Sequence, residues 1–280
     1  MRRIVILLLA LGMAFQARGF QLDLGKVKDL VTHASQLREV NEKEEVEIGS
    51  GVASNLLGAA PLVPDARVQK YVNQVGRWVA QQSERPNLEW HFGVLESDDV
   101  NAFAAPGGYV FITKGLLLKM NSEAELAGVL GHEIGHVLKK HHLKAIQKNA
   151  QMGLFADALS IASQKSKNTE ALNKISGIGT ELYARGLDKD DEFEADRIGV
   201  VLAARGGYDP YGLPLVLQTL ANLNPQDSSL ALMFKTHPAP TARLETLDKA
   251  MSVNLDKYAT QPGLAARFVK TLEPDQEKQK

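Results

Sequence analysis

The sequence predicts an α+β fold that is mostly helical, with one small sheet that carries an open edge strand. Three observations lead to this prediction. Apolar residues recur at three- and four-residue spacing before residue 82 and again after residue 122, as they do on one face of a helix. Residues 90–113 hold short β-branched and aromatic runs bounded by turn residues, which are typical of strands. The 280 residues are 44% apolar, which is enough to bury a sizeable core.

The first predicted elements are helices, and strands follow them. The helical pattern runs from Leu22 to Gln82 with one break. Within it, the charged run Glu39 to Glu47 is expected to form a solvated helix face. Strands are predicted at Trp90 to Leu95 and at Tyr109 to Thr113. Between them, Val100 to Ala105 is extended and small enough to form the edge strand.

Long helices follow the sheet. The segment Ser122 to Glu125 carries a capping-box signature and begins the first one. A second is expected from about Asp190 to Ala204, and two more follow Pro210 and Pro240, each with proline near its first helical position. The segment Leu143 to Thr180 separates the first two long helices. It fits equally well a lid over a cleft or a further part of the helical core.

The N-terminus, residues 1–19, is typical of an export signal. A short basic start precedes the apolar run Ile4 to Phe15, and small residues at Ala17 to Gly19 suit cleavage. The run is shorter than the roughly 20 residues that span a bilayer. We therefore expect residues 20–272 to form one exported domain without a transmembrane anchor, followed by a flexible tail at 273–280. The periplasm of a Gram-negative bacterium is the expected location.

The charge balance and the lack of cysteine exclude several classes of function. Thirty-two Lys and Arg against 33 Asp and Glu leave a net charge of -1, which provides no overall positive field for a nucleic-acid partner. Without cysteine there is no disulfide, thiolate nucleophile, cysteine zinc cluster or lipid-modified cysteine. Any metal site must therefore use His, Asp or Glu.

One motif carries the chemistry, the segment His132 to His136, which reads His-Glu-Ile-Gly-His inside the first long helix. Residues four apart lie on one helix face, so both imidazoles can bind one cation while Glu133 projects beside the open coordination position. This HEXXH spacing predicts a zinc peptidase. The histidines His33, His91 and His142 are expected to be surface or packing residues.

The second long helix supplies candidates for a third zinc ligand. A catalytic zinc takes three protein ligands and a water, and without cysteine the third must be a carboxylate or another histidine. Glu192 is the first candidate, and the spacing leaves Glu194 and Asp196 as alternatives. Glu192 and Asp196 share one face, so Asp196 can accept the second N–H of a ligating imidazole. Small Ala195 would let the two helices approach closely.

Several short motifs occur in a fixed order from about Glu44 to Leu247. They are Val100 to Ala104, Pro106 to Tyr109, Gly115 to Leu117, Glu125 to Val137, Glu192 to Asp196, Gly207 to Pro210 and Thr236 to Pro238. With these motifs the sequence resembles the prenyl-protein-endopeptidase-like (CAAX protease type) family of HEXXH zinc metallopeptidases, in its soluble periplasmic branch. The resemblance implies a zincin-like fold that binds one Zn²⁺ per chain.

The same resemblance implies a role for each residue of the site. His132, His136 and Glu192 would bind zinc. Glu133 would be the catalytic base. Glu192 is favoured over its neighbours because the family's third ligand stands three residues before an Ala-Asp pair.

Two further residues follow from the resemblance. His237 lies close to the metal in periplasmic relatives, where it would act as a fourth, displaceable ligand or stabilise the oxyanion. Arg243 is a weaker candidate for the same pocket.

The expected partner is an unfolded polypeptide. Asn101, Ala102, Phe103 and Ala104 lie on the predicted edge strand, where an extended peptide can add as a further strand through backbone hydrogen bonds. The resemblance adds quality control of misfolded periplasmic or outer-membrane proteins as the biological role. The alternative is a zinc-dependent holdase that binds unfolded chains with little or no proteolysis. The sequence predicts no oligomeric state.

Overall fold

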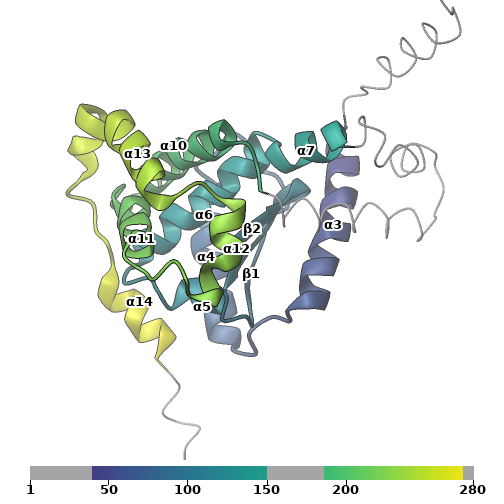
Figure 1. Ribbon diagram of the computed structural model, residues 1–280, viewed down its shortest axis with the longest axis horizontal. Coiled ribbons are helices and arrows are strands. Elements are labelled where there is room, and N and C mark those ends of the chain that lie inside the picture. Colours follow the sequence, from purple (N-terminus) through teal and green to yellow (C-terminus); the bar gives the residue numbers. More distant parts are fainter. Residues whose placement is uncertain (1–39, 150–185, 274–280) are drawn as a thin grey trace, which may run out of the picture. The chain divides into compact units, whose positions relative to one another are not determined.

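The computed structural model describes residues 40–149 and 186–273, and helices dominate this part of the chain (Figure 1). The strands are β1 (His91–Leu95), β2 (Ala102–Ala105) and β3 (Tyr109–Thr113). The helices are α3 (Glu42–Ala59), α4 (Ala66–Ala80), α5 (Lys114–Leu117), α6 (Glu123–Leu138), α7 (His141–Asn149), α10 (Lys189–Arg205), α11 (Gly212–Ala221), α12 (Ala231–Thr236), α13 (Pro240–Leu255) and α14 (Ala265–Leu272). The predicted α+β class, mostly helical with a small sheet, is confirmed.

The three strands form one sheet in the order β1-β3-β2. Strand β1 runs parallel to β3, and β2 runs antiparallel to β3 with Phe103 opposite Phe111. Among the described strands, β2 therefore lies at an edge, as the sequence predicts. The first strand begins at His91, one residue later than expected, and the buried Trp90 just before it donates its indole N–H to the carbonyl of Arg85 at 3.0 Å.

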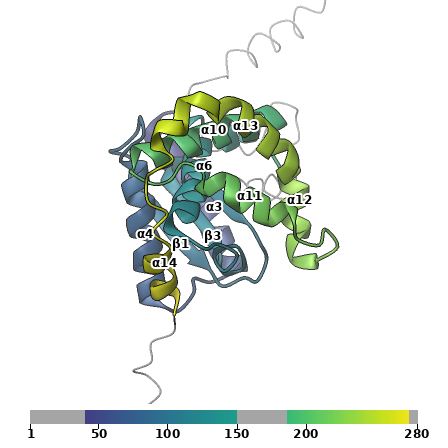
Figure 2. The same cartoon turned by 90° about the vertical axis from the view of Figure 1, so that its left-hand side faces the viewer.

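Helix α6 is the centre of the fold. Ser122 caps its start by accepting the N–H of Glu125 at 3.2 Å, as predicted, but the carboxylate of Glu125 accepts from the backbone N–H of Asn121 at 2.9 Å, so only half of the predicted capping box forms. Every residue from Glu123 to Val137 is buried, because α4, α10 and α11 pack around the helix (Figure 2) and β2 also contacts it. A single apolar stripe is therefore too narrow a description of α6. The motif histidines lie in the interior of the protein.

Small residues set the distance between α6 and α10. A Cβ added at Gly131 would lie 2.9 Å from the carbonyl oxygen of Gly199, and one added at Gly199 would lie 2.8 Å from the backbone nitrogen of His132. Ala195 faces Gly135 in the same way, at 3.2 Å from a Cβ built there. The predicted close approach at Ala195 is thus confirmed, and it brings the ligand candidates of both helices together.

The charged run Glu39 to Glu47 is predicted to be a solvated face, and in its described part Glu42, Lys43 and Glu47 are exposed, but Glu45 is not. Glu45 is 1% exposed. Its carboxylate accepts hydrogen bonds from Arg85 at 2.8 Å and from the backbone N–H of Gly107 at 3.2 Å, and it lies 3.2 Å from Nζ of Lys140. Charge alone could not reveal this, because the partners come from distant segments.

The downstream helices start close to the predicted places. Helix α13 begins at Pro240, as expected. Helix α11 begins at Gly212, so Pro210 precedes the helix instead of standing at its first position. No helix in the described ranges has both the length and the apolar character needed to cross a membrane.

Three sequence predictions fall on other parts of the chain. The export signal at 1–19 and the tail after Glu273 lie outside the described residues. Of the segment Leu143 to Thr180, only the part within α7 is described.

Candidate metal centre

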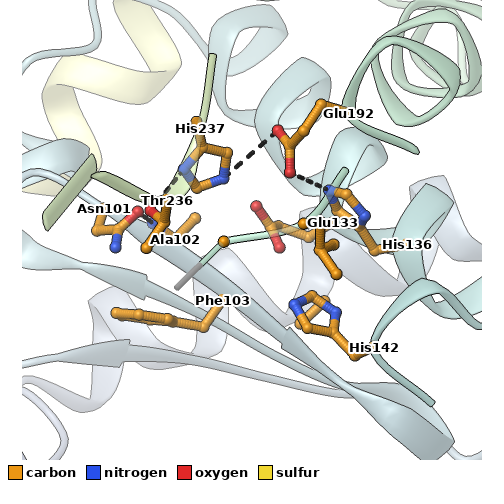
Figure 3. Close-up of a pocket in the computed structure, with 12 residues that line it drawn as sticks. Asn101, Ala102, Phe103, Glu133, His136, His142, Glu192, Thr236 and His237 are labelled. Carbon is orange, nitrogen blue, oxygen red and sulfur yellow. Dashed lines mark hydrogen bonds and ion pairs between the residues drawn. The ribbon is translucent and has the colours of Figure 1, made fainter. Parts of the chain in front are cut away.

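Three elements bring the candidate ligands together (Figure 3). Helix α6 presents His132 and His136, α10 presents Glu192, and His237 follows directly after α12. The first three are buried, and the side chain of His237 is 15% exposed. The carboxyl group of Glu133 points into the space between them.

The distances suit one tetrahedral ion. The Nε2 atoms of His132 and His136 are 3.1 Å apart. Glu192 places Oε2 at 3.7 Å from the first of these atoms and Oε1 at 3.5 Å from the second. Two ligand atoms on one tetrahedral zinc ion are about 3.3 Å apart. The three predicted ligands therefore converge without any rearrangement of the helices.

His237 belongs to the same cluster. Its Nε2 lies 3.8 Å from Oε2 of Glu192, and its Nδ1 lies 2.9 Å from the hydroxyl of Thr236. One ligand atom each from His132, Glu192 and His237 all lie within 4.8 Å of one another. His237 is thus within reach of a fourth coordination position.

The carboxylates make the site suitable for a cation. Oε2 of Glu192 is buried and accepts no hydrogen bond from any residue that the structure describes. Burial raises the pKa of Glu192 to about 8, although the charge of Arg243 opposes this shift. Burial and the nearby charge of Glu192 also raise the pKa of Glu133 to about 8. Keeping both buried carboxyl groups ionised costs free energy, and a bound cation would offset that cost, so the donor set fits a metal ion.

Asp196 holds the back of His132. Its Oδ1 lies 2.9 Å from Nδ1 of His132, and Arg243 binds both carboxylate oxygens, at 2.5 and 2.9 Å. Burial raises the pKa of Asp196, but the charge and hydrogen bonds of Arg243 outweigh burial and hold it well below its usual range. Because the ionised carboxylate can only accept, Nδ1 of His132 carries the proton and Nε2 faces the cluster. Arg243 therefore supports the site through Asp196, and its Nη2 also lies 3.3 Å from Nδ1 of His132.

The other acidic candidate points elsewhere. Glu194 forms an ion pair with Lys139 at 2.8 Å and lies 3.2 Å from Nε2 of His141. It is not brought to the cluster. The spacing of the acidic residues could not show whether Glu192 or Glu194 is the ligand candidate, whereas the packing of α10 against α6 turns only Glu192 to the cluster.

The sequence prediction missed His141 and undervalued His142. Nδ1 of His141 lies 3.0 Å from Nδ1 of His136. His142 lines the hollow beside His136, with the ring centres 5.4 Å apart. Helical periodicity could not place either residue, because α6 ends at Leu138 and the chain turns at Lys140.

Two hollows meet at Glu133. The first is lined by Asn101, Ala102, Phe103 and Ala104, the predicted substrate-binding residues, and by His237. The second shares part of this wall and extends between α6 and α11 over apolar side chains. Those apolar residues are Leu116, Val129, Leu213, Val216, Leu217, Leu220 and Met233.

Comparison of the sequence with known proteins identifies a family. The pattern of peptidase family M48 matches residues 66–251. The chain is 28% identical over 246 residues to the beta-barrel assembly-enhancing protease of Escherichia coli O157:H7, which covers 86% of this chain and 50% of the relative.

Two other relatives match a shorter part of this chain. The mitochondrial metalloendopeptidase OMA1 of Arabidopsis thaliana is 31% identical over 190 residues, 68% of this chain and 37% of the relative. The metalloprotease YcaL of Escherichia coli (strain K12) is 32% identical over 159 residues, 55% of this chain and 59% of the relative. The chain spans about half the length of the beta-barrel assembly-enhancing proteases that it matches.

The family match contains α6 with its motif, Glu192 on α10 and His237, which are the elements that build the cluster. The chain belongs to peptidase family M48.

Proposed function

We propose that this chain is a zinc-dependent endopeptidase that hydrolyses peptide bonds in unfolded or misfolded proteins. The observation that carries the proposal is the convergence of His132, His136 and Glu192 on one point, with the carboxyl group of Glu133 beside it. Membership of a peptidase family supports the same chemistry. A set of nitrogen and oxygen ligands is also the kind found at hydrolytic zinc sites.

His132, His136 and Glu192 would hold one Zn²⁺, and His237 would reach a fourth position. When bound, zinc supplies Lewis acidity, which makes water easier to deprotonate and polarises a peptide carbonyl. The chain keeps both histidines neutral and turned inward, since burial lowers the pKa of each. His237 stands where it can also stabilise negative charge on the carbonyl oxygen.

Glu133 would move the proton. Its carboxylate takes a proton from the attacking water, so that the oxygen can form a bond to the peptide carbon. It then gives the proton to the departing amine nitrogen as the carbon–nitrogen bond breaks. The products are one carboxylic acid and one amine, and Glu133 returns to its ionised form. Burial in the site keeps bulk water from competing for that proton.

The substrate would lie along β2. Asn101, Ala102, Phe103 and Ala104 line the hollow that contains Glu133. The buried Nδ2 of Asn101 donates to no residue that the structure describes, and it can serve a substrate carbonyl. Recognition through backbone groups favours extended, unfolded segments over folded proteins.

The biological role would be protein quality control in the periplasm. Several relatives are beta-barrel assembly-enhancing proteases of Gram-negative bacteria. The predicted export signal at residues 1–19 agrees with that location. We place the chain in the soluble periplasmic branch of the family, as a single domain over residues 20–272.

A holdase that binds unfolded chains without cutting them is the second candidate. The position of His237 favours it, because this side chain can occupy the coordination position that water needs. Replacing His237 with alanine separates two roles. Activity should rise if His237 blocks the metal, and it should fall if His237 stabilises the transition state.

The deciding experiment compares the wild type with Glu133→Gln on casein, an unfolded protein. Losing the general base should reduce cleavage by about 10²- to 10⁴-fold, while zinc content stays at one ion per chain. Equal turnover by both proteins at equal zinc content would reject the mechanism. Glu192→Ala is the matched control, because it should lose zinc and activity together.

A further inference from the structure

A histidine outside the motif stands directly behind His136. The chain leaves α6, turns at Lys140, where φ is 56°, and begins α7 at His141. This turn carries the imidazole of His141 back into the interior, where the residue is 1% exposed. Its Nδ1 lies 3.0 Å from Nδ1 of His136, and the ring planes are 73° apart.

The far side of His141 fixes its own proton. Nε2 of His141 lies 3.2 Å from Oε2 of Glu194 and 3.4 Å from Oδ1 of Asp191. Ionised carboxylates only accept hydrogen bonds, so Nε2 of His141 carries a proton. In the neutral imidazole the other ring nitrogen, Nδ1, is then an acceptor.

The proton between the two rings therefore belongs to His136. With an acceptor 3.0 Å away at His141, Nδ1 of His136 is the donor, and Nε2 of His136 keeps its lone pair. That lone pair faces His132 and Glu192. The opposite tautomer would place a hydrogen where the proposed metal ion binds.

We propose that His141 is a positioning residue that fixes the tautomer and the ring orientation of His136 for metal binding, with Glu194 and Asp191 holding His141 in turn. The proposal rests on the proposed metal site. A ligating imidazole whose second nitrogen donates to a fixed acceptor is a better and more rigid ligand. Asp196 does this for His132, and a neutral histidine does it for His136.

The test measures zinc affinity by competition with a chelator, and the absorption spectrum of the cobalt(II)-substituted protein. His141→Leu removes the acceptor, whereas His141→Asn can return an amide oxygen near the position of Nδ1. Leucine should weaken zinc binding by about 10- to 100-fold and alter the cobalt spectrum. Asparagine should restore most of the affinity and a spectrum close to wild type.

Two results would overturn the proposal: zinc affinity unchanged in His141→Leu, or an equal loss in the leucine and asparagine variants. His91→Leu, which removes a half-exposed histidine far from α7 in sequence, is the control and should bind zinc like the wild type. A wild type that binds no zinc would reject the metal site itself, which is a different outcome.

Folding of each variant is checked by thermal melting of the metal-free protein. If His141→Leu fails to fold, the double variant Asp191→Ala, Glu194→Ala replaces it, because both carboxylates are about one-third exposed. The double variant should weaken zinc binding by up to about tenfold. An unchanged affinity there would equally reject the role of His141.

Discussion

The Nδ1 atoms of the two motif histidines, His132 and His136, have different partners. Behind His132 lies Asp196, which is 1% exposed and bound through both oxygens by the buried guanidinium of Arg243. Behind His136 lies His141, whose own carboxylate partners reach the surface. The partner of His132 thus belongs to a buried ion pair, whereas the partner of His136 contacts carboxylates that are partly exposed to solvent.

This difference separates stability from metal binding. Removing one partner of a buried ion pair leaves an uncompensated charge, which costs several kcal/mol, whereas exposed pairs contribute little. The orientation of His132 is therefore coupled to the folding of α10 and α13. That of His136 depends on a turn and on surface carboxylates, which can change without loss of the fold.

Replacing Arg243 with methionine should have the largest effect on stability. Asp196 would stay buried without its main counter-charge, so the free energy of unfolding should fall by about 3–5 kcal/mol. Denaturant unfolding of the metal-free protein measures this. Arg205→Met is the control, because Arg205 is 52% exposed and its pair with Glu84 at 3.4 Å should contribute less than about 1 kcal/mol. Similar losses in both variants would contradict the comparison.

Gly199→Ala tests the helix packing on the His132 side. The new methyl group would meet the backbone nitrogen of His132 at 2.8 Å, so α10 must move away from α6. We expect a loss of about 1–3 kcal/mol in unfolding free energy and weaker zinc binding. Gly58→Ala in α3 is the matched control, since a Cβ there meets nothing within 4 Å and alanine should not destabilise the helix. A neutral Gly199→Ala would show that the close approach is not required.

Glu45→Gln tests, through its pH dependence, the turn that carries His141 to His136, because Glu45 lies 3.2 Å from Nζ of Lys140 in that turn. Burial raises the pKa of Glu45, but the hydrogen bonds and charge of Arg85 outweigh it, so the folded-state pKa lies below the usual value of 4.5. A lowered pKa means that this stabilisation is fully present above about pH 4.5 and is lost as pH falls through the folded-state pKa. The free energy of unfolding of the wild type should exceed that of Glu45→Gln by about 1 kcal/mol at pH 7, and this difference should shrink in acid. A pH-independent difference in unfolding curves would disprove the assignment.

Lys139→Ala should have the smallest effect. Lys139 is 45% exposed and pairs with Glu194, which is 37% exposed, so the change in unfolding free energy should stay below about 0.5 kcal/mol. Zinc affinity should remain at the wild-type value, because His141 keeps both carboxylates. A zinc affinity as low as that of His141→Leu would mean that surface charge, and not the His141 acceptor, controls His136.

Local patterns in the sequence were sufficient for the helices and strands and for the candidate ligands on α6. The cap at Ser122, the strand Tyr109–Thr113 and the HEXXH spacing depend on neighbouring residues, and the structure agrees with each. The close contact at Ala195 followed from its small size. The roles of the converging ligands stay predictions until a metal is observed.

Partners from distant segments could not be predicted in the same way. The placement of His141 depends on a left-handed residue at Lys140, which no periodicity reveals. The burial of Glu45 depends on Arg85, which lies 40 residues away in sequence. Arg243 entered through the resemblance alone, and its grip on Asp196 requires the fold.

Anomalous diffraction at the zinc absorption edge, from crystals of the purified protein, would locate the metal directly. We expect one strong peak per chain, bonded to Nε2 of His132, Nε2 of His136 and a carboxylate oxygen of Glu192. A peak bound by Glu194 or by surface carboxylates, with none between α6 and α10, would contradict it.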